Sequence, residues 1–182
     1  MLHSKKYLLH RYETKSPLMG GYVGAYGHEG LNAPPLLALA EELRLALPQV
    51  FQDHRLRFLW AYKYDTEFEG IGVHADRAAV NVNLWITPDD ANLDPTRGGL
   101  VVYAAAAPPA SQANGYSNDG GAGLHQVASM EGMPNVTVPY RANRMVLFNS
   151  SLYHRTDALR FKPGNYTRRR INLTFLYGIP YS

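Results

Sequence analysis

The sequence predicts a mainly β domain, built as a sandwich or a barrel, with a single helix near its start. Two observations support this fold class: one early segment has helical spacing of its apolar residues, and several short extended segments rich in valine and aromatic residues follow it. The chain has 182 residues, of which 46% are hydrophobic and 18% are charged. This composition and length are typical of a globular protein, so we expect residues 1–182 to form one domain.

The helix is predicted between Pro34 and Pro48. Proline is favoured in the first turn of a helix, and a later proline cannot continue one. The apolar residues between them are placed on one helical face: Leu36, Leu37, Ala40, Leu43 and Leu47. Residues 1–33 are rich in Gly and Tyr, which is typical of turns and short strands.

The strands are predicted from period-two alternation and from aromatic content. Residues 56–64 are aromatic and extended, and residues 79–87 alternate with unusual regularity. In the second segment one face carries Val80, Val82, Leu84 and Ile86, and the other carries Asn81, Asn83 and Trp85. Further strands are predicted at 99–103, 136–138, 144–148 and 171–177.

Residues 104–135 interrupt the strand pattern with an alanine run, Pro108-Pro109 and a Ser/Asn/Gly-rich stretch. A loop of this length in a compact domain is usually functional or disordered. Because the segment joins two predicted strands, we expect it to be a lid over the open end of the barrel. A passive insertion is the alternative.

Composition also limits the chemistry and the location. The chain contains no cysteine, so disulfides and thiolate metal sites are excluded, and any metal must bind histidine and carboxylate. The net charge of +3 is mildly basic, which suits either nucleic acid or a pocket for an anionic ligand. Residues 1–11 do not resemble a signal peptide, and no segment approaches the roughly 20 apolar residues of a membrane span. We therefore expect a cytoplasmic protein with no membrane partner.

The most informative motif is His74-Ala75-Asp76, together with His154 downstream. On an extended segment, residues two apart point the same way, so His74 and Asp76 can bind one ion. Two imidazoles and one carboxylate can occupy one face of an octahedral metal, which suits the Fe(II) of non-haem oxygenases. His-x-Asp alone arises easily by chance, and a strand-end histidine followed by a turn-forming aspartate is the alternative.

The sequence after His154 supports the metal hypothesis. An Arg-rich strand is predicted from Arg168 to Tyr177, in which Arg168, Arg170, Asn172 and Thr174 share one face. An inward arginine without a partner would be costly to bury, and a dianionic ligand would remove that cost. The planar guanidinium binds carboxylates through two hydrogen bonds, so it suits the distal carboxylate of 2-oxoglutarate.

With these residues in view, residues 56–178 resemble the 2-oxoglutarate/Fe(II)-dependent dioxygenases. Tyr62-Lys-Tyr64 is similar to the tyrosine that precedes His-x-Asp in prolyl-hydroxylase-like members. Trp85 through Gly98-Gly99-Leu100 is similar to the strand and glycine turn of phytanoyl-CoA-hydroxylase-like members. Arg170-Ile-Asn172-Leu-Thr-Phe175 is similar to the Arg-x-Asn-Leu-Thr-Phe strand of AlkB-type demethylases. Leu176 stands where those demethylases carry a further arginine, so nucleic-acid repair is not implied.

The resemblance implies a double-stranded β-helix (jelly-roll) barrel with the helix packed outside it. It implies that Fe(II) is held by His74, Asp76 and His154 and that 2-oxoglutarate is the co-substrate, converted to succinate and CO2 as dioxygen oxidises the substrate. It places Arg170 at the far carboxylate, assisted by Tyr64 or Asn172, whereas a second register would place Arg168 there. Asn81, Asn83 and Trp85 would line the inner face.

Three other interpretations remain at the level of sequence. The first is a cupin-like barrel that binds without catalysis, and the second is a Zn(II) hydrolase that uses Glu67 or Glu69 as its base. The third is an AlkB-type nucleic-acid demethylase, although no base-reading element is apparent and nucleic acid is not expected as a partner. For an oxygenase, hydroxylation of a small molecule, an amino acid or a peptide side chain all fit.

Overall fold

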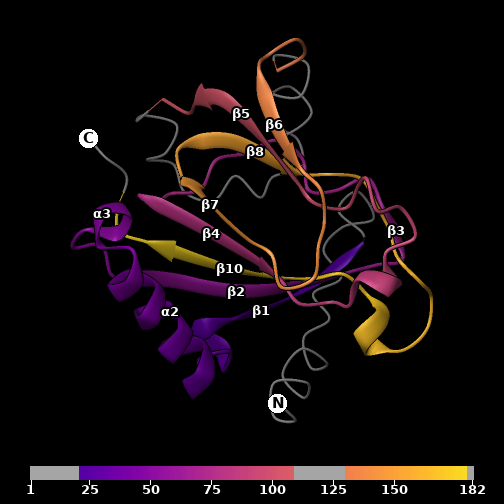
Figure 1. Ribbon diagram of the computed structural model, residues 1–182, viewed down its shortest axis with the longest axis horizontal. Helices are drawn as coiled ribbons and strands as arrows, with labels where there is room; N and C mark the ends of the chain where they lie inside the picture. Colours follow the sequence, from indigo (N-terminus) through magenta and orange to yellow (C-terminus); the bar gives the residue numbers. More distant parts are fainter. Residues whose placement is uncertain (1–20, 109–129, 180–182) are drawn as a thin grey trace.

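The computed structural model describes residues 21–108 and 130–179, and these form a mainly β protein (Figure 1). The larger sheet has the strand order β1-β2-β10-β4-β7, and all of its pairs are antiparallel. These strands are β1 (Tyr22–Tyr26), β2 (Leu56–Tyr64), β10 (Ile171–Tyr177), β4 (Val80–Trp85) and β7 (Met145–Asn149). The predicted β class is confirmed.

A three-stranded antiparallel sheet, in the order β6-β5-β8, lies on one side of the larger sheet (Figure 1). A short two-stranded sheet pairs β3 with β9. These strands are β6 (Asn135–Val138), β5 (Leu100–Ala106), β8 (Leu152–Thr156), β3 (Glu67–Phe68) and β9 (Leu159–Arg160).

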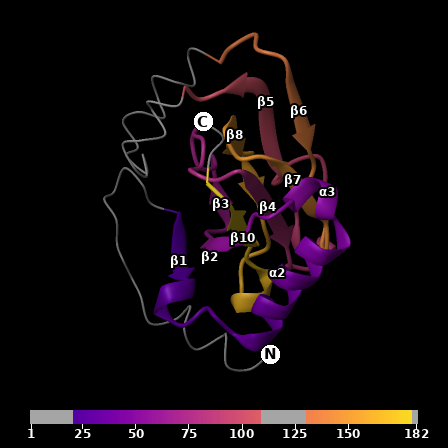
Figure 2. The same ribbon diagram turned by 90° about the vertical axis from the view of Figure 1, so that its left-hand side faces the viewer.

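The helices α2 (Pro34–Ala46) and α3 (Pro48–Phe51) lie on the side of the larger sheet away from β5, β6 and β8 (Figures 1 and 2). Three short 3-10 helices complete the structure: η1 (Gly27–Glu29), η2 (Asp89–Ala91) and η3 (Tyr166–Arg168). Within the described ranges no helix is long and apolar enough to cross a membrane.

Helix α2 confirms the predicted helix but not its whole apolar face. Ala40 is buried, and the partly buried residues against the sheet are Leu36, Leu39, Leu43 and Leu47. Leu37 is 44% exposed, so its assignment to the buried face is wrong, and Leu39 takes that position. Ala40 lies where α2 contacts β10, and the Tyr177 hydroxyl donates to its carbonyl over 3.0 Å.

The alternation along β4 separates two buried layers. Val80, Val82 and Leu84 join the core under the helices, while Asn81 and Asn83 are buried on the opposite face with the neighbouring Trp85. The predicted division of this strand is therefore confirmed. Ile86, predicted to continue the apolar face, lies beyond the end of β4 and is exposed.

Two predicted boundaries differ from the structure. The strand expected from Arg168 begins only at Ile171, because residues 166–168 form η3. The segment 104–135, expected as a lid outside the scaffold, is strand at both ends: β5 continues to Ala106, and β6 begins at Asn135. Residues 109–129 of that segment lie outside the described residues.

The glycine pair before β5 is required by a close backbone approach. Gly98 has φ +81°, a left-handed conformation that glycine adopts without strain. A Cβ at Gly99 would lie 1.8 Å from the carbonyl oxygen of Val138, the last residue of β6. The backbone of β5 can therefore pair with β6 at this end only if residue 99 is glycine.

We expect Gly99→Ala to lower the free energy of unfolding by at least about 2 kcal/mol, because backbone must move to relieve the overlap. Gly27→Ala is the matched control, since its Cβ would find ordinary contacts of 3.4 Å or more. Urea unfolding of both variants measures the difference. Equal stability of the two would contradict the close-approach argument.

Candidate metal centre

His74, Asp76 and His154 meet at one point between the sheets, with one ligand-type atom from each lying within 4.8 Å of the others. The His154 Nε2 atom lies 3.4 Å from Asp76 Oδ2, and the His74 Nε2 atom lies 4.0 Å from Asp76 Oδ1. The two imidazole ring centres are 4.3 Å apart. His154 is 3% exposed, whereas His74 and Asp76 are half-buried.

Backbone pairing fixes this convergence. His74 and His154 form an isolated antiparallel bridge, in which each amide donates to the other's carbonyl over 2.9 and 2.8 Å. The Asp76 amide donates to the Ser150 carbonyl, and the Ser150 hydroxyl donates to the Asp76 carbonyl. The His-x-Asp segment is thus held to the turn before β8 and to β8 itself. His154 lies in the middle of β8.

Each histidine is oriented through its second ring nitrogen. His74 Nδ1 lies 2.7 Å from the Gly72 carbonyl, and His154 Nδ1 lies 2.9 Å from the Leu152 carbonyl. A carbonyl only accepts, so both Nδ1 atoms donate, and in the neutral form of each ring the Nε2 atom then keeps a lone pair. This is the tautomer in which Nε2 can bind a metal. No sequence pattern indicates these carbonyl partners, because they depend on the local backbone path.

The protonation states also suit metal binding. Burial, reinforced by the nearby His154 ring, lowers the pKa of His74 and so favours its neutral form. Burial alone would raise the pKa of Asp76, but the two histidines and a hydrogen bond from Asn81 outweigh it and lower that pKa. The result is a neutral imidazole beside an ionised carboxylate.

Arg170 is the buried cation on the same inner face, only 1% exposed. Its Nε donates to the Gly98 carbonyl over 2.6 Å, and its Nη2 donates to the Gly99 carbonyl over 3.3 Å. The guanidinium lies 4.6 Å from the Tyr64 ring centre. Across residues 21–108 and 130–179, no ion pair includes Arg170, and Nη1 has no hydrogen-bond partner.

Burial lowers the pKa of the Arg170 guanidinium, and the neighbouring phenols of Tyr64 and Tyr140 partly offset this. A guanidinium nevertheless stays charged in proteins. Thr87 fixes the backbone around it: its hydroxyl donates to the Arg169 carbonyl and accepts from the Ile171 amide. Arg170 is therefore held as a fixed, buried positive charge.

The other two arginines of the run point elsewhere. Arg168 lies in η3, is 39% exposed and pairs with Asp90. Arg169 pairs with Asp65 over 3.1 Å. The expectation that Arg168 also points inward is wrong, because the strand that would have placed it there begins three residues later.

Tyr64 packs against the Arg170 guanidinium, and Asn172 follows Arg170 by two residues at the start of β10. The Tyr64 hydroxyl is 3.4 Å from the hydroxyl of Thr156, two residues beyond His154 on β8. Asn172 pairs across the sheet with Trp85. The Asn172 Oδ1 and Trp85 Nε1 atoms, like Arg170 Nη1, are buried and without a partner among the described residues. Buried polar atoms normally have partners, so this cluster favours a polar ligand.

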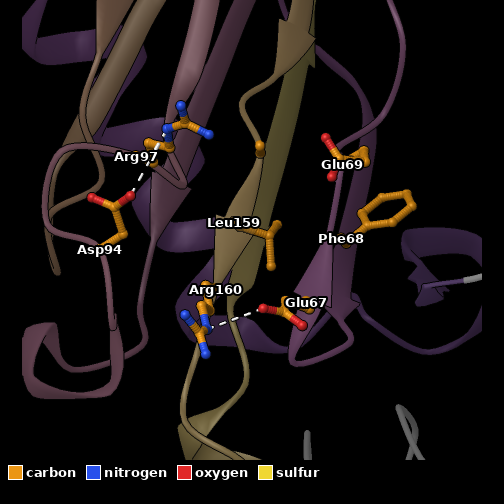
Figure 3. A pocket seen from close by; sticks show the side chains of 8 residues that line it. Glu67, Phe68, Glu69, Asp94, Arg97, Leu159 and Arg160 are labelled. Carbon is orange, nitrogen blue, oxygen red and sulfur yellow. Dashed lines mark ion pairs between the residues drawn. The ribbon is translucent and has the colours of Figure 1, made fainter.

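A pocket lies at the short β3–β9 sheet, and Figure 3 shows the residues that line it. Glu67 points to Arg160 and Asp94 to Arg97, each as an ion pair. None of the triad residues lines this pocket. Glu67, one candidate base of the Zn(II) hydrolase interpretation, thus forms an ion pair with Arg160 and lies outside the triad.

Comparison with known proteins gives matches at the level of structure. No family model matches the sequence, and no curated protein matches it. The non-haem α-ketoglutarate-dependent epimerase SnoN from nogalamycin biosynthesis has a TM-score of 0.58 at 16% identity, over 97% of this chain and 69% of that one. HygX from Streptomyces hygroscopicus, with nickel and 2-oxoglutarate bound, has a TM-score of 0.54 at 17% identity, over 99% and 78%.

The carbocyclase SnoK, also non-haem and α-ketoglutarate-dependent, has a TM-score of 0.53 at 13% identity, over 87% of this chain and 66% of that one. The likeness covers nearly the whole described chain, and identities this low establish the fold alone. This protein therefore shares the fold of these three solved structures.

The role of Thr87 at the Arg170 backbone is testable. We expect Thr87→Val, which keeps the shape and removes the hydroxyl, to lower the free energy of unfolding by about 2 kcal/mol, because two hydrogen bonds to buried backbone are lost. Thr96→Val is the matched control, since its hydroxyl bonds only to the exposed Asp94. Chemical denaturation compares them, and equal losses would show that Thr87 does not anchor this backbone.

Proposed function

We propose that this protein is an Fe(II)- and 2-oxoglutarate-dependent oxygenase. The observation that carries the proposal is the buried Arg170: among the described residues no acidic side chain forms an ion pair with it and its Nη1 atom has no hydrogen-bond partner, which leaves a fixed positive charge beside Tyr64 and Trp85. A buried unpaired cation is costly, so its retention favours an anionic ligand. The three-residue donor set of the triad suits Fe(II) with open coordination positions.

The residues present fit the metal. His74, Asp76 and His154 would hold it, because their Nε2 lone pairs and carboxylate already converge. The absence of thiolates excludes the soft-ligand sites, and the two-histidine, one-carboxylate set is typical of non-haem Fe(II). When bound, Fe(II) and 2-oxoglutarate would supply the activation of dioxygen.

The residues also fit the co-substrate. Arg170 Nη1 and Trp85 Nε1 are donors without partners, and carboxylate oxygens are acceptors. Tyr64 packs against the guanidinium and limits where it can move. We therefore assign the far carboxylate of 2-oxoglutarate to Arg170, with Tyr64 and Asn172 beside it. The buried surroundings exclude water and so strengthen this pairing.

The substrate is proposed to be a small molecule. One HygX structure holds hygromycin B as well as nickel and 2-oxoglutarate, and SnoN and SnoK are named as an epimerase and a carbocyclase. Hydroxylation of a small molecule, an amino acid or a peptide side chain is the simplest outcome. We further propose that the two larger sheets close as a double-stranded β-helix, with residues 1–182 as a single domain.

We expect the purified protein to bind one divalent metal and His74→Ala to lose tight binding, because the remaining two side chains are a poor chelate. Titration calorimetry with Mn(II) under anaerobic conditions measures this. His28→Ala is the matched control, since His28 is 78% exposed and outside the site. An unchanged affinity in His74→Ala would contradict the assignment of the triad.

We expect Arg170→Ala to raise the dissociation constant of 2-oxoglutarate at least tenfold, since loss of a charge-assisted pair costs about 1.5–3 kcal/mol. The measurement is titration of the weak visible charge-transfer band of the anaerobic Fe(II) complex. Arg168→Ala removes a neighbouring surface arginine and should leave the constant unchanged. A loss in Arg168→Ala with none in Arg170→Ala would move the anchor to Arg168.

A further inference from the structure

A continuous line of side-chain hydrogen bonds leaves the metal centre along the inner face of the larger sheet. The Asn81 amide donates to Asp76 Oδ2 over 2.7 Å, and the Asn83 amide donates to Asn81 Oδ1 over 2.7 Å. The Thr174 hydroxyl donates to Asn83 Oδ1 over 3.3 Å, and the Asn172 amide donates to Thr174 Oγ1 over 2.8 Å. We call these four residues, Asn81, Asn83, Thr174 and Asn172, the amide relay; all are buried.

The relay has one direction, and Asp76 sets it. An ionised carboxylate only accepts, so Asn81 must turn its amide nitrogen toward Asp76 and its oxygen toward Asn83. Asn83 must then donate to Asn81 and accept from Thr174, which leaves the Thr174 oxygen to accept from Asn172. Each orientation follows from the one before it. The charge at Asp76 therefore fixes the orientation of the Asn172 amide, at the far end of the relay.

The far end of the relay lies in the proposed co-substrate pocket. Asn172 is two residues from Arg170 on the same face and pairs across the sheet with Trp85. Because its nitrogen donates to Thr174, Asn172 presents its oxygen, and this is the Oδ1 atom without a partner. The relay thus connects the carboxylate of the triad to the group beside Arg170.

We propose that Asn81 is a positioning residue for the metal ligand Asp76 and that the amide relay behind it sets the orientation of that carboxylate. This inference rests on the proposed function. Asp76 lies on a segment outside the named strands, so its backbone is held by few ladder bonds, and its side chain can rotate unless it is tied. The hydrogen bond from Asn81 comes from β4, a fully buried interior strand of the larger sheet. The fixed position of this strand therefore restricts the Asp76 side chain.

The test measures metal binding directly, with Mn(II) affinity by calorimetry and the visible d–d spectrum of the Co(II) complex, in the absence of 2-oxoglutarate. Asn81→Leu removes the amide and keeps the volume. We expect a loss of affinity of about 10- to 100-fold, the usual effect of removing a hydrogen-bond partner of a ligand, and a changed Co(II) spectrum. Asn92→Leu is the matched control: Asn92 is also buried, but it bonds to the Arg97 carbonyl and not to the relay.

Thr174→Val interrupts the relay without touching Asp76, so it tests transmission even if Asn81→Leu does not fold. We expect a smaller loss in Mn(II) affinity, about threefold or more, with a shifted Co(II) spectrum, because the Asn83 oxygen loses its hydrogen bond and Asn83 then supports Asn81 less firmly. Wild-type affinity and spectrum in the folded variants would overturn the positioning role. A wild-type protein that binds neither ion would instead overturn the proposed function, so the two failures are distinguishable.

Discussion

The candidate site depends on one short pairing, the antiparallel bridge in which the backbones of His74 and His154 exchange two hydrogen bonds. The two histidines are 80 residues apart in the chain, and this bridge sets them side by side. A shift of the bridge by one residue would turn one imidazole away from the other, because side chains alternate along extended backbone. The Ser150–Asp76 contacts on the next residues exclude such a shift. The metal geometry is thus a consequence of strand register.

The same alternation along the strands of the larger sheet places core residues on one face and the residues of the candidate site on the other. On β4 and β10 the outward residues pack under the helices and supply the apolar core. Most inward residues are polar and hydrogen-bond to one another: Asn81, Asn83, Asn172 and Thr174. This arrangement reduces the usual cost of burying amides, since nearly every donor and acceptor is paired. Of the four buried side-chain atoms without a partner among the described residues, three lie on Arg170, Asn172 and Trp85, and the fourth, the Tyr166 hydroxyl, packs against the core under the helices. The position of those exceptions identifies the pocket more clearly than any single residue does.

Local sequence patterns were sufficient to predict the faces and bounds of buried strands but not the orientation of side chains near the strand ends. The alternation of Val and Asn in residues 79–87 predicted both faces of β4, and β2 matches the predicted residues 56–64. Arg168 could not be separated from Arg170 by parity, because a 3-10 turn before β10 breaks the alternation. The carbonyls that orient the two histidines belong to Gly72 and Leu152, whose backbone groups carry no sequence signal. Tertiary pairing decided these points, as it generally does at strand ends.

Under the proposed function, the charge on Arg170, which forms no ion pair among the described residues, makes the stability of the protein depend on its anionic ligand. Any ligand that binds the folded state and not the unfolded chain stabilises it, by about 2.7 kcal/mol when its free concentration is one hundred times its dissociation constant. A cell poor in the anionic ligand would therefore hold a larger unfolded fraction, which proteases remove. Abundance of this protein would then follow the supply of a central metabolite without any dedicated regulator. An arginine kept without a carboxylate partner would in this way link proteolysis to metabolism.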